Sequence, residues 1–209
     1  MPLGLPGGEI LLAFTLTSVL IEITPGPNMA WLAILTLNEG RRAGYAAVAG
    51  VTLGLALVGA VAAMGLAAII AASPLAYQGL RWGGVGFLLW LAWDGWHDEK
   101  PGGDQPDADG RLGLSFRRGL LTNLLNPKAA MFYLAVLPTF AGPDGLRPAE
   151  TAALSAIYVG VATIIHAGIV TLAATARVWL TDQRRQRLTR RILSLLLAGV
   201  ALWFAWKSA

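Results

Sequence analysis

The sequence predicts an all-α polytopic membrane protein. Of its 209 residues, 56% are hydrophobic and only 13% are charged, and the mean hydropathy is +0.59. A soluble domain carries about 25% charged residues, so a chain of this size could not cover a water-exposed surface. The same composition excludes intrinsic disorder, which goes with low hydrophobicity. Cysteine is absent, which excludes disulfides, thiolate metal sites and cysteine nucleophiles.

Six apolar stretches are long enough to cross a bilayer, which takes about 20 residues. The predicted spans are residues 9–37, 44–72, 75–96, 114–140, 151–179 and 188–207. The first is interrupted around Pro25 and Pro27, and the fourth is interrupted at Pro127. Because the first stretch has no preceding basic residue and no small-residue cleavage pattern after it, we expect it to be retained rather than removed as a signal peptide.

The distribution of lysine and arginine predicts the orientation in the membrane. Eleven of the sixteen basic residues lie in three predicted loops, near residues 38–43, 97–118 and 180–191. Since positively charged loops face the cytoplasm, six spans place both termini outside. If the two interrupted stretches were re-entrant hairpins, the last of these loops would lie opposite the first. The charge bias therefore favours two interrupted stretches that cross the membrane.

The chain divides into two similar halves, about residues 1–96 and 114–209, joined by a polar linker at 97–113. Each half contains three predicted spans, and the first span of each is broken at a proline. Because three is an odd number, the second repeat must be inverted relative to the first. Paired, interrupted segments in an inverted repeat indicate the binding site of a transporter.

Each break is expected to start a new half-helix. Gly26 can act as N-cap before Pro27, and Asn126 can do the same before Pro127. A helix N-terminus offers N–H groups and a positive dipole to a carboxylate, and the preceding carbonyl ends suit an ammonium or a proton carrier. Together the breaks offer both poles that a zwitterionic amino acid needs. The alternative is that each proline only kinks its helix.

Two ionisable side chains, Glu22 and Lys128, lie beside these breaks, and His166 lies in the middle of the fifth predicted span. A charge at membrane depth is costly and usually functional. We expect Glu22 and Lys128 to meet near the midplane, where Lys128 would hold the substrate carboxylate and Glu22 would attract the ammonium or carry a proton. The alternative is a structural ion pair between the halves. His166 is a further candidate for proton coupling, although a lone histidine more often bonds between helices.

Two motifs make the chain resemble the LysE/RhtB family of amino-acid exporters. They are Thr24-Pro25-Gly26-Pro27-Asn28 and Asn123-Leu124-Leu125-Asn126-Pro127-Lys128, the second flanked by Phe116, Gly119, Phe132, Pro138 and Phe140. The resemblance covers nearly the whole chain as a single domain, residues 1–209. It implies a transporter of the bacterial inner membrane that expels amino acids or related metabolites by proton antiport. Lysine exporters of this family tend to carry an acidic residue where Leu55 follows Gly54, so a neutral substrate is favoured.

The expected substrate-binding residues are those of both breaks and their flanks: Glu22, Thr24, Pro25, Gly26, Pro27, Asn28, Asn123, Asn126, Pro127 and Lys128. The expected partners are an amino acid, protons and the lipid bilayer, and small-xxx-small patterns at 50–54 and 79–83 would allow a homodimer. We expect no cofactor, no metal and no nucleic acid, since the spans lack clustered metal ligands and the basic run at 184–191 suits lipid headgroups.

Two other classes of function compete with amino-acid export, besides a passive channel, against which the matched, broken halves favour alternating access. The first is export of another small cation or metabolite by a member of the wider superfamily. The second is an intramembrane enzyme, but Ser73, Ser155 and Ser194 lack the context of an activated nucleophile. We therefore do not expect an enzyme.

Overall fold

The structure is a computed structural model, and it describes residues 7–64, 73–96, 108–142, 145–179 and 183–207. In these ranges the regular elements are helical, apart from one isolated bridge between Gly142 and Gly145. In chain order they are α1 (Gly8–Ile23), α2 (Pro27–Glu39), α3 (Arg41–Ala63), α5 (Pro74–Trp96), α6 (Ala108–Leu124), α7 (Pro127–Met131), the π-helical η1 (Phe132–Val136), the 3-10 helix η2 (Leu137–Phe140), α8 (Pro148–Trp179) and α9 (Gln183–Lys207). The predicted all-α class is confirmed.

The described helices supply between two and four candidate membrane spans. Arg41–Ala63 and Pro148–Arg177 are each long and apolar enough to cross a bilayer alone. Two further candidates are bent pairs: α1 with α2, bent by 57°, and α6 with the segment that ends at Phe140, bent by 47°. Within α5 a shorter apolar helix spans Trp82–Trp93. The number of six spans and the inversion of the repeats therefore stay predictions.

Two predicted segments fall partly outside the described residues. Residues 65–72, the end of the second predicted span, are not described, and neither are residues 97–107 of the predicted linker. The remaining part of that linker is helical, because α6 already begins at Ala108. The fourth predicted span thus begins inside a helix rather than at its start.

α3 packs mainly against α6 and α8. Glycines allow α3 and α6 to approach backbone to backbone: a Cβ at Gly50 would overlap the carbonyl oxygen of Phe116, and one at Gly119 would overlap that of Ala47. Such close approach is typical of helices that pack through small residues in a membrane. The corresponding glycines of the second half, Gly160 and Gly168, have no atoms of the described chain near enough to meet an added Cβ.

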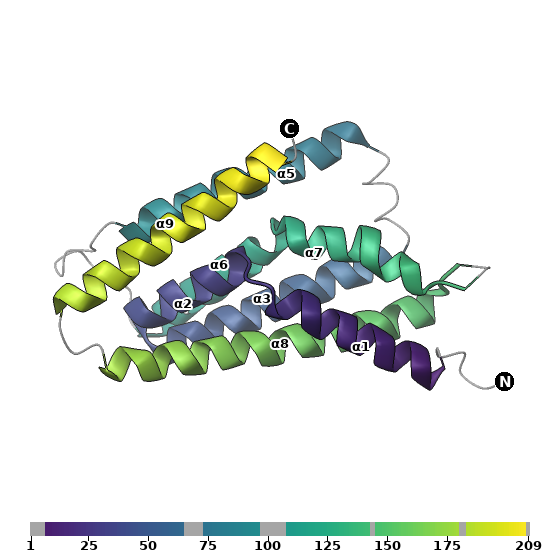
Figure 1. The fold of residues 1–209 in the computed structure, drawn as a ribbon, viewed down its shortest axis with the longest axis horizontal. Helices are drawn as coiled ribbons and strands as arrows, with labels where there is room; N and C mark the ends of the chain where they lie inside the picture. Colours follow the sequence, from purple (N-terminus) through teal and green to yellow (C-terminus); the bar gives the residue numbers. More distant parts are fainter. Residues whose placement is uncertain (1–6, 65–72, 97–107, 143–144, 180–182, 208–209) are drawn as a thin grey trace.

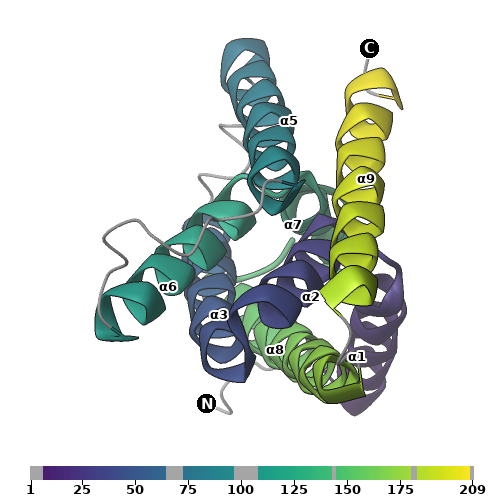
Figure 2. The ribbon, with the colours of Figure 1, turned by 90° about the vertical axis from the view of Figure 1, so that its left-hand side faces the viewer.

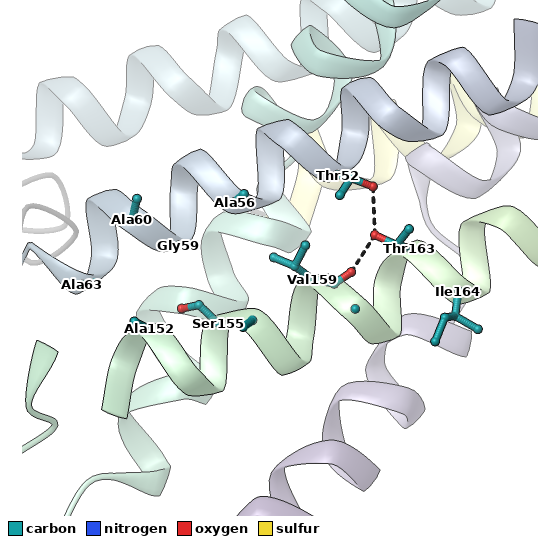
Figure 3. Close-up of a pocket in the computed structure, with 12 residues that line it drawn as sticks. Thr52, Ala56, Gly59, Ala60, Ala63, Ala152, Ser155, Val159, Thr163 and Ile164 are labelled. Atoms are coloured by element: carbon teal, nitrogen blue, oxygen red, sulfur yellow. Dashed lines mark hydrogen bonds between the residues drawn. The ribbon is translucent and has the colours of Figure 1, made fainter. Parts of the chain in front are cut away.

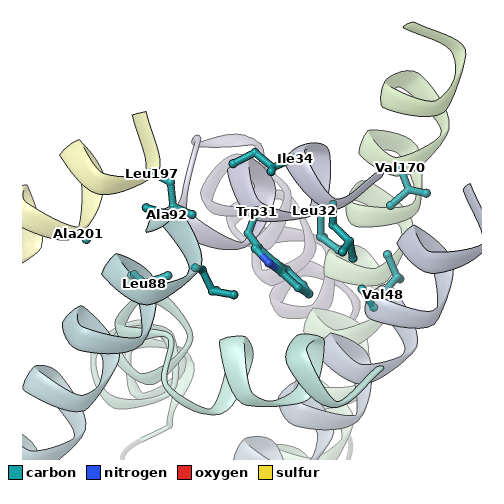
Figure 4. Close-up of a cluster of buried hydrophobic side chains, with 12 residues drawn as sticks. Trp31, Leu32, Ile34, Val48, Leu88, Ala92, Val170, Leu197 and Ala201 are labelled. Atoms are coloured by element: carbon teal, nitrogen blue, oxygen red, sulfur yellow. The ribbon is translucent and has the colours of Figure 1, made fainter. Parts of the chain in front are cut away.

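α5 and α9 lie side by side along one edge of the molecule and contact the other helices mainly through α2 (Figures 1 and 2). A cluster of buried apolar side chains makes this connection. Trp31 of α2 lies at its centre, with Leu88 of α5, Leu197 of α9 and Val170 of α8 around it (Figure 4). α2, the second half of the first broken pair, is therefore anchored on several sides.

A second apolar cluster joins the first half of that pair to the second half of the chain. Phe14 of α1 packs edge-on against Phe132 and Phe140, and Phe132 stacks on Tyr158 of α8. Tyr158 belongs to this cluster, and its hydroxyl donates a hydrogen bond to Glu22, so the cluster adjoins the polar groups described below.

Candidate functional site

Both predicted breaks are true helix boundaries. Gly26, in an extended conformation, is the N-cap of α2, and Pro27 is its first residue. Asn126 is the N-cap of α7, and its Oδ1 accepts the backbone N–H of Lys128 at 3.0 Å. The capping expected at both positions is confirmed. Bends of 57° and 47° exceed a mild kink, and proline accounts for them because it cannot donate the backbone hydrogen bond that would continue the helix.

Glu22 is the centre of a buried polar cluster built by α1, α7 and α8. Glu22 is only 4% exposed to solvent. The hydroxyl of Tyr158 donates to Oε1 at 2.7 Å, while Oε2 lies 3.7 Å from Nζ of Lys128 and 3.7 Å from Nε2 of His166. The structure therefore brings together all three ionisable residues that the sequence singles out. It adds a tyrosine that the motifs do not contain.

Lys128 connects the two breaks. Besides facing Glu22, its Nζ donates to the backbone carbonyl of Thr24 at 3.1 Å, at the end of α1. Gly26 packs against the same side chain, and a Cβ there would lie 3.4 Å from Cδ of Lys128. The ammonium of Lys128 thus occupies the two acceptors that the sequence suggests for a substrate ammonium: a carbonyl at a helix end and the carboxylate of Glu22.

Tyr158 is a site residue that the sequence motifs miss. Its ring stacks on Phe132 with centroids 3.5 Å apart and planes 6° apart, which holds the hydroxyl against Glu22. The sequence feature that could have identified Tyr158 is its place inside an apolar helix, since a buried hydroxyl needs a hydrogen-bond partner. Tyr158 also lies eight residues before His166, so both side chains project from similar faces of α8.

A second polar contact joins the breaks directly. Nδ2 of Asn28, in the first turn of α2, donates to Oδ1 of Asn123, in the last turn of α6, at 3.1 Å. The two residues are 4% and 1% exposed. Gly54 of α3 backs this pair, because a Cβ there would lie 3.0 Å from both Cβ and Nδ2 of Asn123.

Other predicted residues contribute backbone rather than side chains. The Thr24 hydroxyl donates to the carbonyl of Leu20 in its own helix, so only the backbone carbonyl of Thr24 faces Lys128. Thr24 and Pro25 are exposed, whereas Gly26, Pro27 and Asn126 are buried. In the part of the chain that the structure describes, no group of three or more His, Asp or Glu side chains gathers as a metal site would.

A separate groove of about 650 Å³ runs between α3 and α8. Small side chains such as Ala56, Gly59 and Ala152 line it, and a hydrogen bond of 2.8 Å between the hydroxyls of Thr52 and Thr163 crosses one end (Figure 3). None of the predicted site residues lines this groove. The groove is thus distinct from the Glu22 cluster.

Broken helices that meet around a buried charged cluster, in a chain of apolar helices, define a class: a multi-pass membrane transporter. Residues 19–208 match the family model described as LysE type translocator. The chain therefore belongs to the LysE type translocator family, whose members are transporters and not enzymes. The family resemblance inferred from the two proline motifs is confirmed.

Several curated proteins are similar along most of their length. A homoserine/homoserine lactone efflux protein of Salmonella typhimurium is 29% identical over 182 residues, which cover 84% of this chain and 85% of the relative. A leucine efflux protein of Klebsiella pneumoniae is 25% identical over 195 residues, covering 91% and 92%. An uncharacterized membrane protein of Vibrio cholerae is 29% identical over 167 residues, covering 79% and 82%. No solved structure matches the chain significantly.

Proposed function

We propose that this protein exports amino acids or close derivatives from the cytoplasm by proton antiport, with the substrate held between the two proline-broken helices. Similarity to proteins named for homoserine and leucine efflux supports the substrate class. The observation that carries the proposal is the Glu22 cluster. One buried carboxylate lies within 3.7 Å of a lysine and a histidine at the junction of both breaks.

Lys128 acts in this proposal as an internal substitute for the substrate ammonium. Without substrate, its charge balances Glu22 and its Nζ occupies the carbonyl of Thr24. An amino acid supplies both an ammonium and a carboxylate. The substrate ammonium takes over Glu22 and the Thr24 carbonyl, and Lys128 turns to the substrate carboxylate. While Glu22 is ionised, the buried site then carries no net charge with or without the substrate, which avoids the large cost of an unpaired charge in a medium of low polarity.

The same geometry links substrate release to proton entry. A proton and a substrate ammonium compete for the carboxylate of Glu22, so protonation from outside weakens the hold on the substrate. Loss of that proton to the cytoplasm restores the site for the next substrate. His166 provides a second proton acceptor 3.7 Å from the carboxylate, and Tyr158 fixes the other carboxylate oxygen by its hydrogen bond.

The test measures proton-driven amino-acid transport by the purified full chain in proteoliposomes. The variants are Glu22→Gln, Lys128→Gln and a double variant, Glu22→Lys with Lys128→Glu, which exchanges the two charges. We expect both single variants to lose proton-driven export. Glu150→Gln, which removes a carboxylate from the exposed pair with Arg147, serves as the matched control. If both single variants export normally, the site assignment is wrong. If the exchanged pair exports like the wild type, the ion pair is structural only.

The proposal includes six crossings in two inverted repeats within a single domain, with both termini outside the cytoplasm. This arrangement is the one that the distribution of basic residues favours. It would place the breaks, and with them Glu22 and Lys128, near the middle of the bilayer, where discontinuous helices of transporters hold their substrates.

A further inference from the structure

The Asn28–Asn123 pair carries an inference about substrate selection that rests on the proposed function. We infer that this pair contacts the substrate side chain and selects amino acids whose side chain carries both a hydrogen-bond donor and an acceptor, namely a hydroxyl or a carboxamide. The argument depends on which hydrogen bonds the two amides make and which they leave unmade.

The one hydrogen bond of the pair leaves two polar atoms without a partner. Among the described residues, Oδ1 of Asn28 and Nδ2 of Asn123 are buried and bond to nothing. A carboxamide contributes one acceptor oxygen and one donor NH₂ group. If the oxygen and nitrogen positions of both carboxamides were exchanged, Asn123 would donate to Asn28. One acceptor and one donor would again be left without a partner. The result therefore does not depend on how the amide oxygens and nitrogens are assigned.

Few chemical groups satisfy a free acceptor and a free donor together. An ammonium only donates, and a carboxylate only accepts, so each leaves one of the two atoms unmatched. An aliphatic side chain matches neither atom, and buried amide groups without partners are costly. A hydroxyl or a carboxamide can accept from Nδ2 of Asn123 and donate to Oδ1 of Asn28. The pair is therefore complementary to these two groups.

The position of the pair suits a side-chain subsite. Asn28 lies two residues beyond Gly26, about 3 Å along the helix axis, and Gly26 packs against Lys128. Asn123 lies one turn before Asn126, which caps the helix that carries Lys128. A small amino acid with its charged groups at Glu22 and Lys128 can therefore reach the amide pair with its side chain.

The surroundings of the pair explain how it keeps its geometry and when it meets the substrate. Gly54 packs directly against Asn123, which limits the positions open to this amide. With exposures of 4% and 1%, the pair is closed off in the described conformation. It meets a substrate only when α2 and α6 separate, and alternating access of two repeats provides such a movement.

Two pairs of amino acids of nearly equal shape test the inference in proteoliposomes that contain the full chain. Threonine and valine differ by a hydroxyl for a methyl group, and asparagine and leucine differ by a carboxamide for an isopropyl group. We expect kcat/KM of proton-driven exchange to favour threonine and asparagine by about tenfold, the factor that one or two net hydrogen bonds supply. In Asn28→Leu and Asn123→Leu the ratios should fall to within about twofold of one. Ser194→Ala, which removes a buried hydroxyl from α9 away from the site, should leave them unchanged.

The outcomes separate this inference from the proposed function. If the wild type exchanges valine and leucine as well as threonine and asparagine, selection by the amide pair is overturned and amino-acid export stands. If the asparagine variants keep the wild-type ratio, the pair is only a structural bridge, or a bound water satisfies it. If the protein exchanges none of these amino acids for protons, the proposed function fails and this inference fails with it. The wild-type ratio needs no variant, so poor folding of Asn123→Leu leaves the first comparison intact.

Discussion

Nζ of Lys128 lies 3.7 Å from the carboxylate of Glu22, although the two residues belong to opposite halves of the chain. Each stands beside a helix break, and the same Nζ donates to the carbonyl that ends the first half-helix. A buried ion pair is a weak source of stability, because desolvation offsets most of the attraction. In the proposed function, the pair lies at both breaks because its charges are exchanged during transport.

Loss of one partner should destabilise the protein more than loss of both. Lys128→Met leaves Glu22 as an uncompensated buried charge, which we expect to cost about 3 kcal/mol. The double variant with Glu22→Gln removes that charge and should recover most of the loss. Thermal unfolding of the detergent-solubilised single and double variants measures the coupling. Additive effects of the two changes would show that the residues do not interact.

Tyr158→Phe should weaken transport while leaving the apolar packing in place. The ring can still stack on Phe132, but Glu22 loses the hydrogen bond from the hydroxyl, which for a charged acceptor contributes about 2 kcal/mol. We expect kcat/KM for proton-driven exchange to fall about tenfold or more. Tyr133→Phe is the matched control, since its buried hydroxyl donates to the carbonyl of Leu55 and not to Glu22. Equal losses in both variants would contradict a specific role for Tyr158.

The close packing of α3 and α6 should be sensitive to a single methyl group. In Gly50→Ala the new Cβ would overlap the backbone oxygen of Phe116, so the helices must move apart. We expect a lower melting temperature and a lower yield of folded protein. Gly160→Ala, where an added Cβ meets no atom of the described chain, should leave both quantities unchanged. A Gly50→Ala protein as stable as the wild type would contradict the close contact between Gly50 and the backbone of Phe116.

The proposed orientation can be tested without background labelling, because the chain contains no cysteine. Single cysteines at Gly7 and Ala209 should react with a membrane-impermeant maleimide added from outside. A single cysteine at Gln183 should react only from the cytoplasmic side. This pattern follows from the excess of basic residues in the loops assigned to the cytoplasm. Labelling of Gly7→Cys and Ala209→Cys from opposite sides would require an odd number of crossings and would refute the six-span arrangement.

The sequence was sufficient for features that depend on local chemistry. Pro27 and Pro127 cannot continue a helix hydrogen-bond ladder, and Gly26 and Asn126 precede them as caps, so both breaks could be located from neighbouring residues alone. The scarcity of charge in apolar stretches likewise directed attention to Glu22, Lys128 and His166. Each of these inferences uses residues a few positions apart or the cost of burying one side chain.

Tertiary packing decided which groups meet. Three contacts join segments that lie far apart in the sequence. The bond from Tyr158 to Glu22 spans 136 residues. The bond from Asn28 to Asn123 spans 95 residues, and the contact of Lys128 with the Thr24 carbonyl spans 104. The two halves contain similar glycines, but these glycines have different surroundings. Gly50 contacts α6 closely, whereas Gly160 faces open space. A linear pattern records which residues a helix presents but not the helix that covers them, because distance between elements is set by packing across the whole bundle.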